Sequence, residues 1–186
     1  MTLTVDVKKV LFTTFACFLL AASAFTLDSK DQATLYSPFL FTTVTILTAL
    51  DRLRVNKLKA VGLGLMLTLP VFFVSVLAGV GLTQILRHAH AGLVVSSAMS
   101  AGLMFLVSSL YFSIERFKTG LAITAVLGFS VPFVIQLVEL CLPGTKSPAG
   151  FVEDPGLFFI CWQTFVGLGI SIGVWGRAGQ GKHTSA

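Results

Sequence analysis

Two apolar segments that each contain a proline hold the residues best suited to do chemistry in this chain. In the second of them, Pro132, Gln136 and Glu139 are spaced by four and three residues, which puts them on one face of a helix. Glu139 is the only carboxylate well inside an apolar segment. A charged residue at the centre of a membrane helix costs about 2.5–3.5 kcal/mol, so it is a functional candidate by default. Glu139 lies near the outer end of its segment, where interfacial water can reach it.

The first of these segments contains Pro70 near its centre. Gln84 lies near its end, and Arg87, His88 and His90 follow directly after it. We expect them to lie on the same side of a membrane as Glu139 and to form an outer polar cluster with it. Imidazole and carboxylate groups can bind zinc or copper. His-x-His within one turn is a weak pattern, however, so we predict no metal site. An ion pair between Glu139 and Arg87 explains the cluster more simply.

The three cysteines form no CxxC pair and no zinc pattern. Cys141 and Cys161 flank the longest polar loop, and a disulfide between them would tie that loop down in an oxidising compartment. Cys17 lies in an apolar segment and is expected to be a small buried residue. The chain also lacks a P-loop, an HExxH motif, a GxSxG motif and a Rossmann fingerprint. We therefore expect no cofactor and do not favour an enzyme.

The composition is that of a membrane protein. Hydrophobic residues make up 55% of the chain and charged residues only 11%, whereas soluble domains contain about 25% charged residues. Such a chain has too few polar side chains to cover a globule in water, so the lipid bilayer is its expected partner. The formal net charge is +5, but the basic residues lie in short runs between apolar segments. This pattern indicates orientation in a membrane, and we expect no binding of nucleic acid.

The elements that position these residues are six apolar segments, each long enough to cross a bilayer at about 1.5 Å per residue. They cover approximately residues 10–27, 33–50, 60–86, 91–114, 119–142 and 157–176. The predicted fold is an all-α polytopic membrane protein with six transmembrane helices in a single domain. The first segment has a rival interpretation as a cleaved signal peptide, because two lysines precede it and Ala22-Ser23-Ala24 looks like a cleavage site. We favour a retained helix.

Lysine and arginine divide unequally between the two sides of this arrangement. One side holds ten of them: Lys8, Lys9, Arg52, Arg54, Lys57, Lys59, Arg116, Lys118, Arg177 and Lys182. The other side holds Lys30, Arg87 and Lys146. By the positive-inside rule both termini are cytoplasmic. We expect an integral protein of a bacterial inner membrane or a plasma membrane.

Two charged turns resemble each other and indicate an internal repeat. Asp51-Arg52-Leu53-Arg54 and Glu115-Arg116-Phe117-Lys118 each follow one apolar segment and precede another that contains a proline. The two units run in the same direction, so a duplicated two-helix unit would form a parallel repeat. The alternative is a chance resemblance, since apolar segments align with one another by composition alone.

Three classes of function are compatible with these features. The first is a small transporter or channel that moves a solute or ion between the proline-containing helices 60–86 and 119–142, along a path past Gln84, Gln136 and Glu139. The second is a non-catalytic subunit or assembly factor of a larger membrane complex, or a homo-oligomer, which suits the glycine-rich faces. The third is an intramembrane enzyme with an outer site formed by His88, His90 and Glu139. We favour the first.

Overall fold

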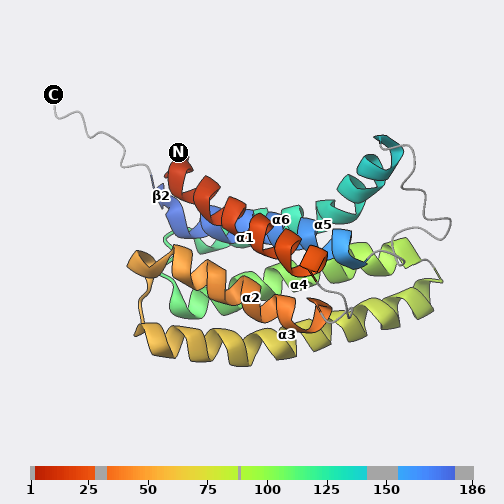
Figure 1. Ribbon diagram of the computed structural model, residues 1–186, viewed down its shortest axis with the longest axis horizontal. Coiled ribbons are helices and arrows are strands. Elements are labelled where there is room, and N and C mark those ends of the chain that lie inside the picture. The colour runs from red at the N-terminus through yellow and green to blue at the C-terminus, as the bar shows by residue number, and fades with distance from the viewer. Residues whose placement is uncertain (1–2, 28–32, 88, 142–154, 179–186) are drawn as a thin grey trace.

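The computed structural model of the protein describes residues 3–27, 33–87, 89–141 and 155–178. Within these residues the chain forms a helical bundle with two very short strands (Figure 1). The helices are α1 Val7–Leu27, α2 Ala33–Thr48, α3 Lys57–Leu86, α4 Ala89–Tyr111, α5 Phe117–Cys141 and α6 Pro155–Trp175. A 3-10 turn, η1 Leu50–Arg52, follows α2, and the strands are β1 Leu3–Val5 and β2 Gly176–Ala178. The predicted all-α class is confirmed.

Five of the described helices, all except α2, are long and apolar enough to cross a membrane. α2 has 16 residues and is therefore about 24 Å long, which is less than the roughly 30 Å of a bilayer's hydrocarbon core. α3 has 30 residues and is about 45 Å long, so it must tilt or extend beyond the hydrocarbon. All six predicted helices are present, but the second is shorter than a full span.

Most helix boundaries differ from the predicted ones by one to three residues, and two of these differences have clear local reasons. α3 begins earlier than residue 60 because the Asn56 side chain accepts a hydrogen bond from the Leu58 N–H at 3.0 Å and caps the helix. α4 ends at Tyr111 rather than at residue 114 because Phe112 leaves the helix to form an isolated antiparallel bridge with Leu53. Local contacts thus lengthen α3 at its start and shorten α4 at its end.

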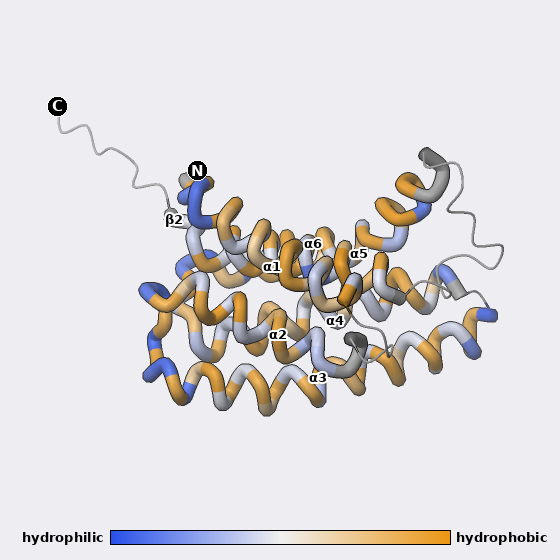
Figure 2. The backbone as a smooth tube through the Cα atoms, in the orientation of Figure 1, coloured by the Kyte–Doolittle hydropathy of each residue, from blue (hydrophilic) through white to orange (hydrophobic). Residues whose placement is uncertain are grey.

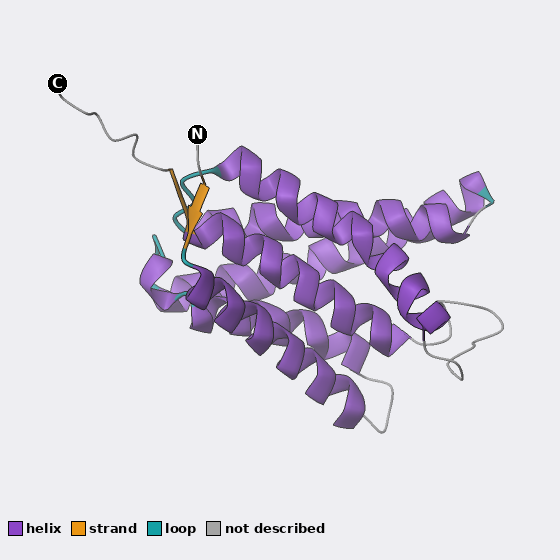
Figure 3. Ribbon diagram, turned by 90° about the horizontal axis from the view of Figure 1, so that it is seen from above, coloured by secondary structure: helices purple, strands orange, loops and turns teal. Residues whose placement is uncertain are grey.

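The six helices pack as a closed ring in chain order, with α6 returning to pack against α1. α6 also contacts α2 and α4, so it is the most central helix. Its inward residues include Val166, Ile170 and Trp175, each at most 2% exposed. The view from above in Figure 3 shows the helices lying alongside one another, with β1 and β2 paired at one end. Because it packs on several neighbours, α6 has half of its apolar span buried.

Small residues bring the helices of this ring close together. A Cβ atom at Gly169 of α6 would lie 2.6 Å from Thr124 Oγ1 and 2.7 Å from Thr124 Cα in α5. Between α4 and α5, the Ser97 hydroxyl donates a hydrogen bond of 2.6 Å to the Gly128 carbonyl. Glycines of the last segment thus lie at helix contacts, which need residues without bulk.

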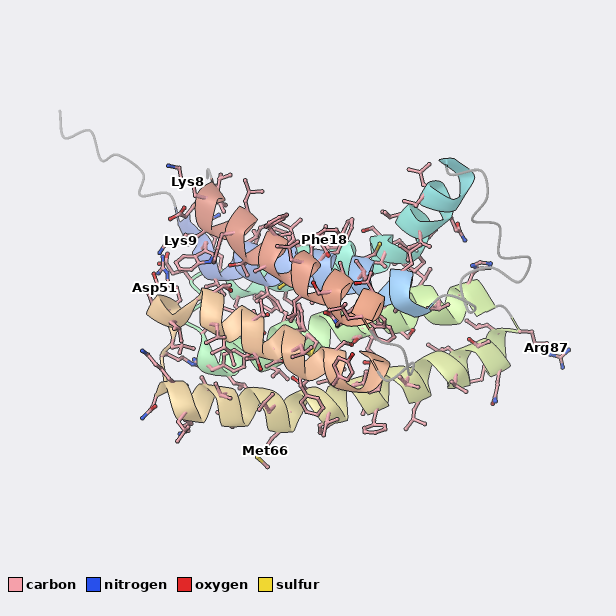
Figure 4. All side chains as sticks on the ribbon, viewed as in Figure 1. Lys8, Lys9, Phe18, Asp51, Met66 and Arg87 are labelled. Carbon is pink, nitrogen blue, oxygen red and sulfur yellow. The ribbon has the colours of Figure 1, made fainter. Side chains whose placement is uncertain are left out.

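Large apolar side chains cover the outside of the bundle. Figure 2 shows hydrophilic residues gathered towards the helix ends and apolar residues along the helices. Phe18 is 41% exposed and Met66 is 76% exposed, and both lie between the two ends of the bundle in Figure 4. A monomeric soluble protein rarely exposes so large a continuous apolar surface. The outer faces therefore suit contact with lipid, and the chain is an integral membrane protein.

The charged turns and both ends of the described chain meet at one end of the bundle, which we call the basic end. There the Arg54 N–H donates to the Tyr111 carbonyl at 3.0 Å, and the Ser113 N–H donates to the Arg52 carbonyl at 2.9 Å. These bonds join the turn after α2 to the turn after α4. The two similar turns are thus neighbours in space, although their origin by duplication stays a prediction.

A lysine from the start of α1 completes the basic end. Lys9 Nζ lies 2.6 Å from Asp51 Oδ2 and 4.1 Å from the centre of the Trp175 ring. Figure 4 shows Lys9 and Asp51 close together at this end. The hydrogen bond from Lys9 lowers the pKa of the Asp51 carboxyl from its ordinary value of 3.8. The ion pair ties α1 to the turn after α2.

Candidate functional site

A cavity of about 500 Å³ lies between α2, α3, α4 and α6. Its volume is in the range of about 300–1,000 Å³ that small-molecule sites occupy. Its α3 wall runs from Thr68 to Gln84, and its α4 wall runs from Leu93 to Met104. These are the last half of α3 and the first half of α4, so the cavity lies in the half of the bundle away from the basic end.

One face of α3 forms the longest wall of the cavity. Its lining residues recur at three- and four-residue spacing from Thr68 through Phe72, Val76 and Val80 to Gln84, as expected for one side of a helix. Pro70 lies just inside this stretch, and a proline there leaves the carbonyl four residues earlier without its helical donor. The Ser75 hydroxyl, also in the wall, donates to the Val71 carbonyl at 2.7 Å.

The floor of the cavity, on the side of the basic end, is a contact between α2 and α3. Thr42 Oγ1 and Thr68 Oγ1 lie 2.7 Å apart, and both residues are at most 1% exposed. A Cβ atom at Gly64, one turn below, would lie 2.7 Å from Thr42 Cγ2. α2 and α3 are therefore tightly packed beside Thr68, at this side of the cavity.

Gln163 of α6 is the exceptional polar residue of the cavity wall. Its side chain is 1% exposed. Within the described residues neither Oε1 nor Nε2 has a hydrogen-bond partner. A buried polar group left unpaired costs about 1–3 kcal/mol, and most such groups in folded proteins are paired. By contrast, the neighbouring Trp162 Nε1 donates to the Ser97 carbonyl at 3.4 Å. The buried and unpaired amide of Gln163 therefore distinguishes this residue from the other polar side chains of the wall.

Five of the lining residues are aromatic and six carry a hydroxyl group. Trp162 lies 6.0 Å from Phe41, measured between ring centroids, and Phe159 lies 6.3 Å from Phe72. Phe159 also stacks on Phe25 of α1 at 5.7 Å with an interplanar angle of 12°. No lining residue in the described part of the chain is charged or a histidine. The cavity therefore suits an uncharged, largely apolar molecule, because an ion would lose its hydration without gaining a counter-charge.

The cavity opens towards the outside of the bundle rather than being sealed within it. Val76 and Val80 line it and are still 46% and 53% exposed. Figure 1 shows the reason, since α3 extends well past the start of the short helix α2. The part of α3 beyond α2 has a packed neighbour in α4 but not in α2. The opening thus faces the side where lipid would lie.

Of the two residues predicted along the path whose side chains are described, Gln84 lines this cavity and Gln136 does not. Gln136 instead contacts His90, with Nε2 and Nδ1 3.2 Å apart, and this exposed pair links α5 to the start of α4. Arg87 ends α3 with a left-handed backbone at φ 53°, and Figure 4 shows it at the end of the bundle opposite Lys8. Gln136 therefore contacts His90, and neither of these two residues lines the cavity that contains Gln84.

Three predicted residues cannot be assessed. His88 and the side chains of Glu139 and Cys141 lie outside the described residues. The described residues contain no group of three His, Cys, Asp or Glu side chains that could hold a metal. The outer polar cluster and the Cys141–Cys161 bridge therefore stay predictions, and of the two cysteines only Cys161 has a described side chain, which is half-buried.

The helices that carry Pro70 and Pro132 do not face each other across the cavity. α3 and α5 each pack extensively against α4 but not against each other, and no described α5 residue lines the cavity. The last turns of α5 point away from α3 in Figure 1. The expected path between these two helices therefore differs from the cavity, whose walls come from α2, α3, α4 and α6.

Four aromatic residues near the ends of apolar segments have the positions of interfacial anchors: Tyr36, Tyr111, Trp162 and Trp175. Tyr36 is 37% exposed, but the other three are buried, at 1%, 8% and 2% exposed. Gln163 was not predicted as a site residue. A signal existed, since it is the only amide or charged residue within the last apolar segment.

Comparison of the chain with protein-family models, with curated proteins and with solved structures found no match.

Proposed function

We propose that this protein is a small membrane transporter that binds an uncharged solute in the cavity between α2, α3, α4 and α6. The observation that carries the proposal is a cavity of about 500 Å³ whose described wall has no charged side chain. Transport of an ion or strongly charged solute is disfavoured, because nothing in that wall would replace its hydration. The sequence predicts a path between α3 and α5, whereas the proposed path lies between α2, α3, α4 and α6.

Passage across the membrane requires the floor of the cavity to open. In this proposal the contact between Thr42 and Thr68 is the closure on the side of the basic end, and the 2.7 Å separation of their hydroxyls supports it. Pro70 lies two residues beyond Thr68, and a proline-containing helix bends more readily because one backbone hydrogen bond is missing. Tilting of α3 about Pro70 would separate Thr68 from Thr42 and expose the solute to the other half of the bundle. With the basic end cytoplasmic, as the positive-inside rule predicts, the cavity faces the non-cytoplasmic side.

Uptake into proteoliposomes tests this proposal. Labelled uncharged solutes of graded size, from polyols to short amides, are compared with a carboxylate and an amine of matched size. Uncharged solutes should enter faster than into protein-free liposomes, and the charged analogues should not. Protein-dependent uptake of the charged analogues alone would contradict the proposal.

The second candidate function, a subunit of a larger membrane complex, has one observation in its favour. The second half of α5, from its midpoint on, carries Phe129, Phe133 and Leu137, which are 48%, 49% and 61% exposed. Figure 1 shows this part of α5 extending away from α3. A partner helix would cover that face. Isolation in mild detergent followed by mass spectrometry tests this, and a single species of one chain would argue against it.

A further inference from the structure

The basic end of the bundle gathers positive charge from three separate stretches of the chain. Its described side chains include eight basic and three acidic ones, which leaves a surplus of five positive charges. The bases are Lys8, Lys9, Arg52, Arg54, Lys57, Lys59, Arg116 and Lys118, and the acids are Asp6, Asp51 and Glu115. Hydrogen bonds between the two charged turns and the ion pair from α1 hold the three stretches together. Figure 2 shows the hydrophilic starts of α1 and α3 at this same end.

Some of these bases are used within the protein. Lys9 pairs with Asp51, and the Lys9 Nζ and the Arg52 guanidinium lie 4.1 and 5.1 Å from the centre of the Trp175 ring. Arg52 and Arg116 are half-buried. The remaining five, which we call the outward bases, are exposed: Lys8, Arg54, Lys57, Lys59 and Lys118. The outward bases are therefore the ones that a ligand can reach.

The four lysines among the outward bases do not stabilise the helices that carry them. Each lies in the first turn of α1, α3 or α5. The helix dipole places partial positive charge at that end, so a cation there is repelled. None of the three helices has an acidic residue in its first turn to offset this repulsion. An anion beside these lysines would offset it instead.

Arg54 is exposed, yet the protein holds it in place. Its Nε donates to the Leu110 carbonyl at 3.0 Å, and its backbone N–H donates to the Tyr111 carbonyl at 3.0 Å. Within the described residues its guanidinium makes no other hydrogen bond. The terminal N–H groups of a guanidinium form a planar fork that binds two oxygens of one phosphate. Arg54 therefore offers such a fork from a fixed position.

Large apolar side chains beside the outward bases indicate which anion this surface meets. Val7, Leu58 and Phe117 each adjoin an outward lysine in the sequence, and they are 60%, 83% and 39% exposed. An acidic protein or a nucleic acid in water would leave these side chains solvated. At a lipid leaflet they can lie among the acyl chains while the adjacent bases meet the headgroups. The combination thus fits the anionic surface of a bilayer.

We propose that the basic end binds anionic phospholipids of the leaflet that it faces, through contacts of their phosphates with Arg54 and with the lysines that begin α1, α3 and α5. Clusters of about four to eight bases beside membrane helices bind anionic lipids in this way. The proposal goes beyond solute transport and does not depend on it, because the cavity lies in the other half of the bundle.

Native mass spectrometry of the full chain in a nonionic detergent tests this proposal. Phosphatidylglycerol and phosphatidylcholine with the same number of acyl carbons but different masses are added in equal amounts, and the ratio of the two bound lipids is measured. Phosphatidylglycerol should predominate by about fivefold or more in the native protein. In Lys57→Gln/Lys59→Gln, and separately in Arg54→Gln, the ratio should fall about fivefold or more, since one base near the surface contributes about 1 kcal/mol.

Arg87→Asn supplies the matched control. Arg87 is a base at the opposite end of the bundle in Figure 4, and asparagine accepts its left-handed backbone at φ 53°. This variant should keep the native ratio of bound lipids. A ratio near one in the native protein, or an equal fall in Arg87→Asn, would overturn the proposal.

Two further measurements separate lipid binding from other roles of these bases. Glycerol phosphate at the concentration of the lipid should not displace phosphatidylglycerol, and displacement would show that the surface binds a soluble phosphate instead. Lys57→Gln/Lys59→Gln should melt at or above the native temperature in lipid-free detergent, followed by circular dichroism, because it removes cations from a helix N-terminus. A lower melting temperature together with the fall in the ratio would assign these lysines to the fold and contradict the proposal.

Discussion

Replacement of Gly169 by alanine should destabilise the bundle because the helices leave no space at that position. The added Cβ would lie 2.6 Å from Thr124 Oγ1 and 2.7 Å from Thr124 Cα. The hydroxyl is fixed, since it donates to the Gly120 carbonyl at 2.8 Å, and the Cα belongs to the helix backbone. The methyl group can therefore be accommodated only if α5 and α6 move apart.

Gly62 of α3 supplies the control for this substitution. A Cβ there meets no atom within 4 Å, so Gly62→Ala changes helix propensity alone and should stabilise by about 0.5–1 kcal/mol. Gly169→Ala gains the same propensity but adds an overpacking cost of about 1–3 kcal/mol. Propensity cancels in the comparison, so Gly169→Ala should be less stable than Gly62→Ala by about 1–3 kcal/mol.

The free energy of unfolding of both variants is measured by reversible denaturation with SDS in mixed micelles, followed by circular dichroism. A second substitution, Gly169→Val, should enlarge the loss because its branches meet the same backbone. Equal stability of the two alanine variants would refute close contact between α5 and α6 at this level, and with it the packing that makes α6 the central helix.

Two further predictions concern the polar contacts around the cavity floor and the basic end. In a double-mutant cycle, Thr42→Val and Thr68→Val should couple by about 0.6 kcal/mol, the average for hydrogen bonds between membrane helices. The free energies of unfolding are measured by the same denaturation with SDS. Strictly additive losses in the double variant would count against the 2.7 Å contact. Asp51→Asn should lose about 0–1 kcal/mol at neutral pH. Because the hydrogen bond from Lys9 lowers the pKa of Asp51, that stability is present above the ordinary carboxyl pKa of 3.8 and is lost as the pH falls through the lowered folded value. The difference between native protein and Asp51→Asn should therefore vanish in acid, and a difference that persists or grows there would contradict the ion pair.

The helices themselves were predictable because the bilayer imposes a simple rule. A membrane segment must satisfy its backbone internally, so long apolar runs become helices. Their ends were less predictable, since local polar contacts decide them. The cap at Asn56 lengthens α3, and the bridge between Leu53 and Phe112 shortens α4. Both depend on partners that a count of apolar residues does not contain.

The site was harder to predict because each helix is apolar on nearly every face. In a soluble protein an apolar stripe marks the buried side of a helix, but lipid and bundle interior are equally apolar here. The pattern of apolar residues alone could not show that the Gln163 side chain is buried while Gln136 contacts the exposed His90. Nor could the resemblance of the two charged turns reveal that α4 packs between α3 and α5.

The central claim, that solute occupies the cavity beside α3, is tested most directly by filling that cavity with one side chain. Val76 lines it, whereas the next residue, Leu77, is 70% exposed and does not line it. Uptake of the best uncharged solute is measured in proteoliposomes with equal amounts of Val76→Trp and Leu77→Trp. We predict that Val76→Trp falls to the rate of protein-free liposomes while Leu77→Trp keeps the native rate. Equal uptake by the two variants would contradict the claim.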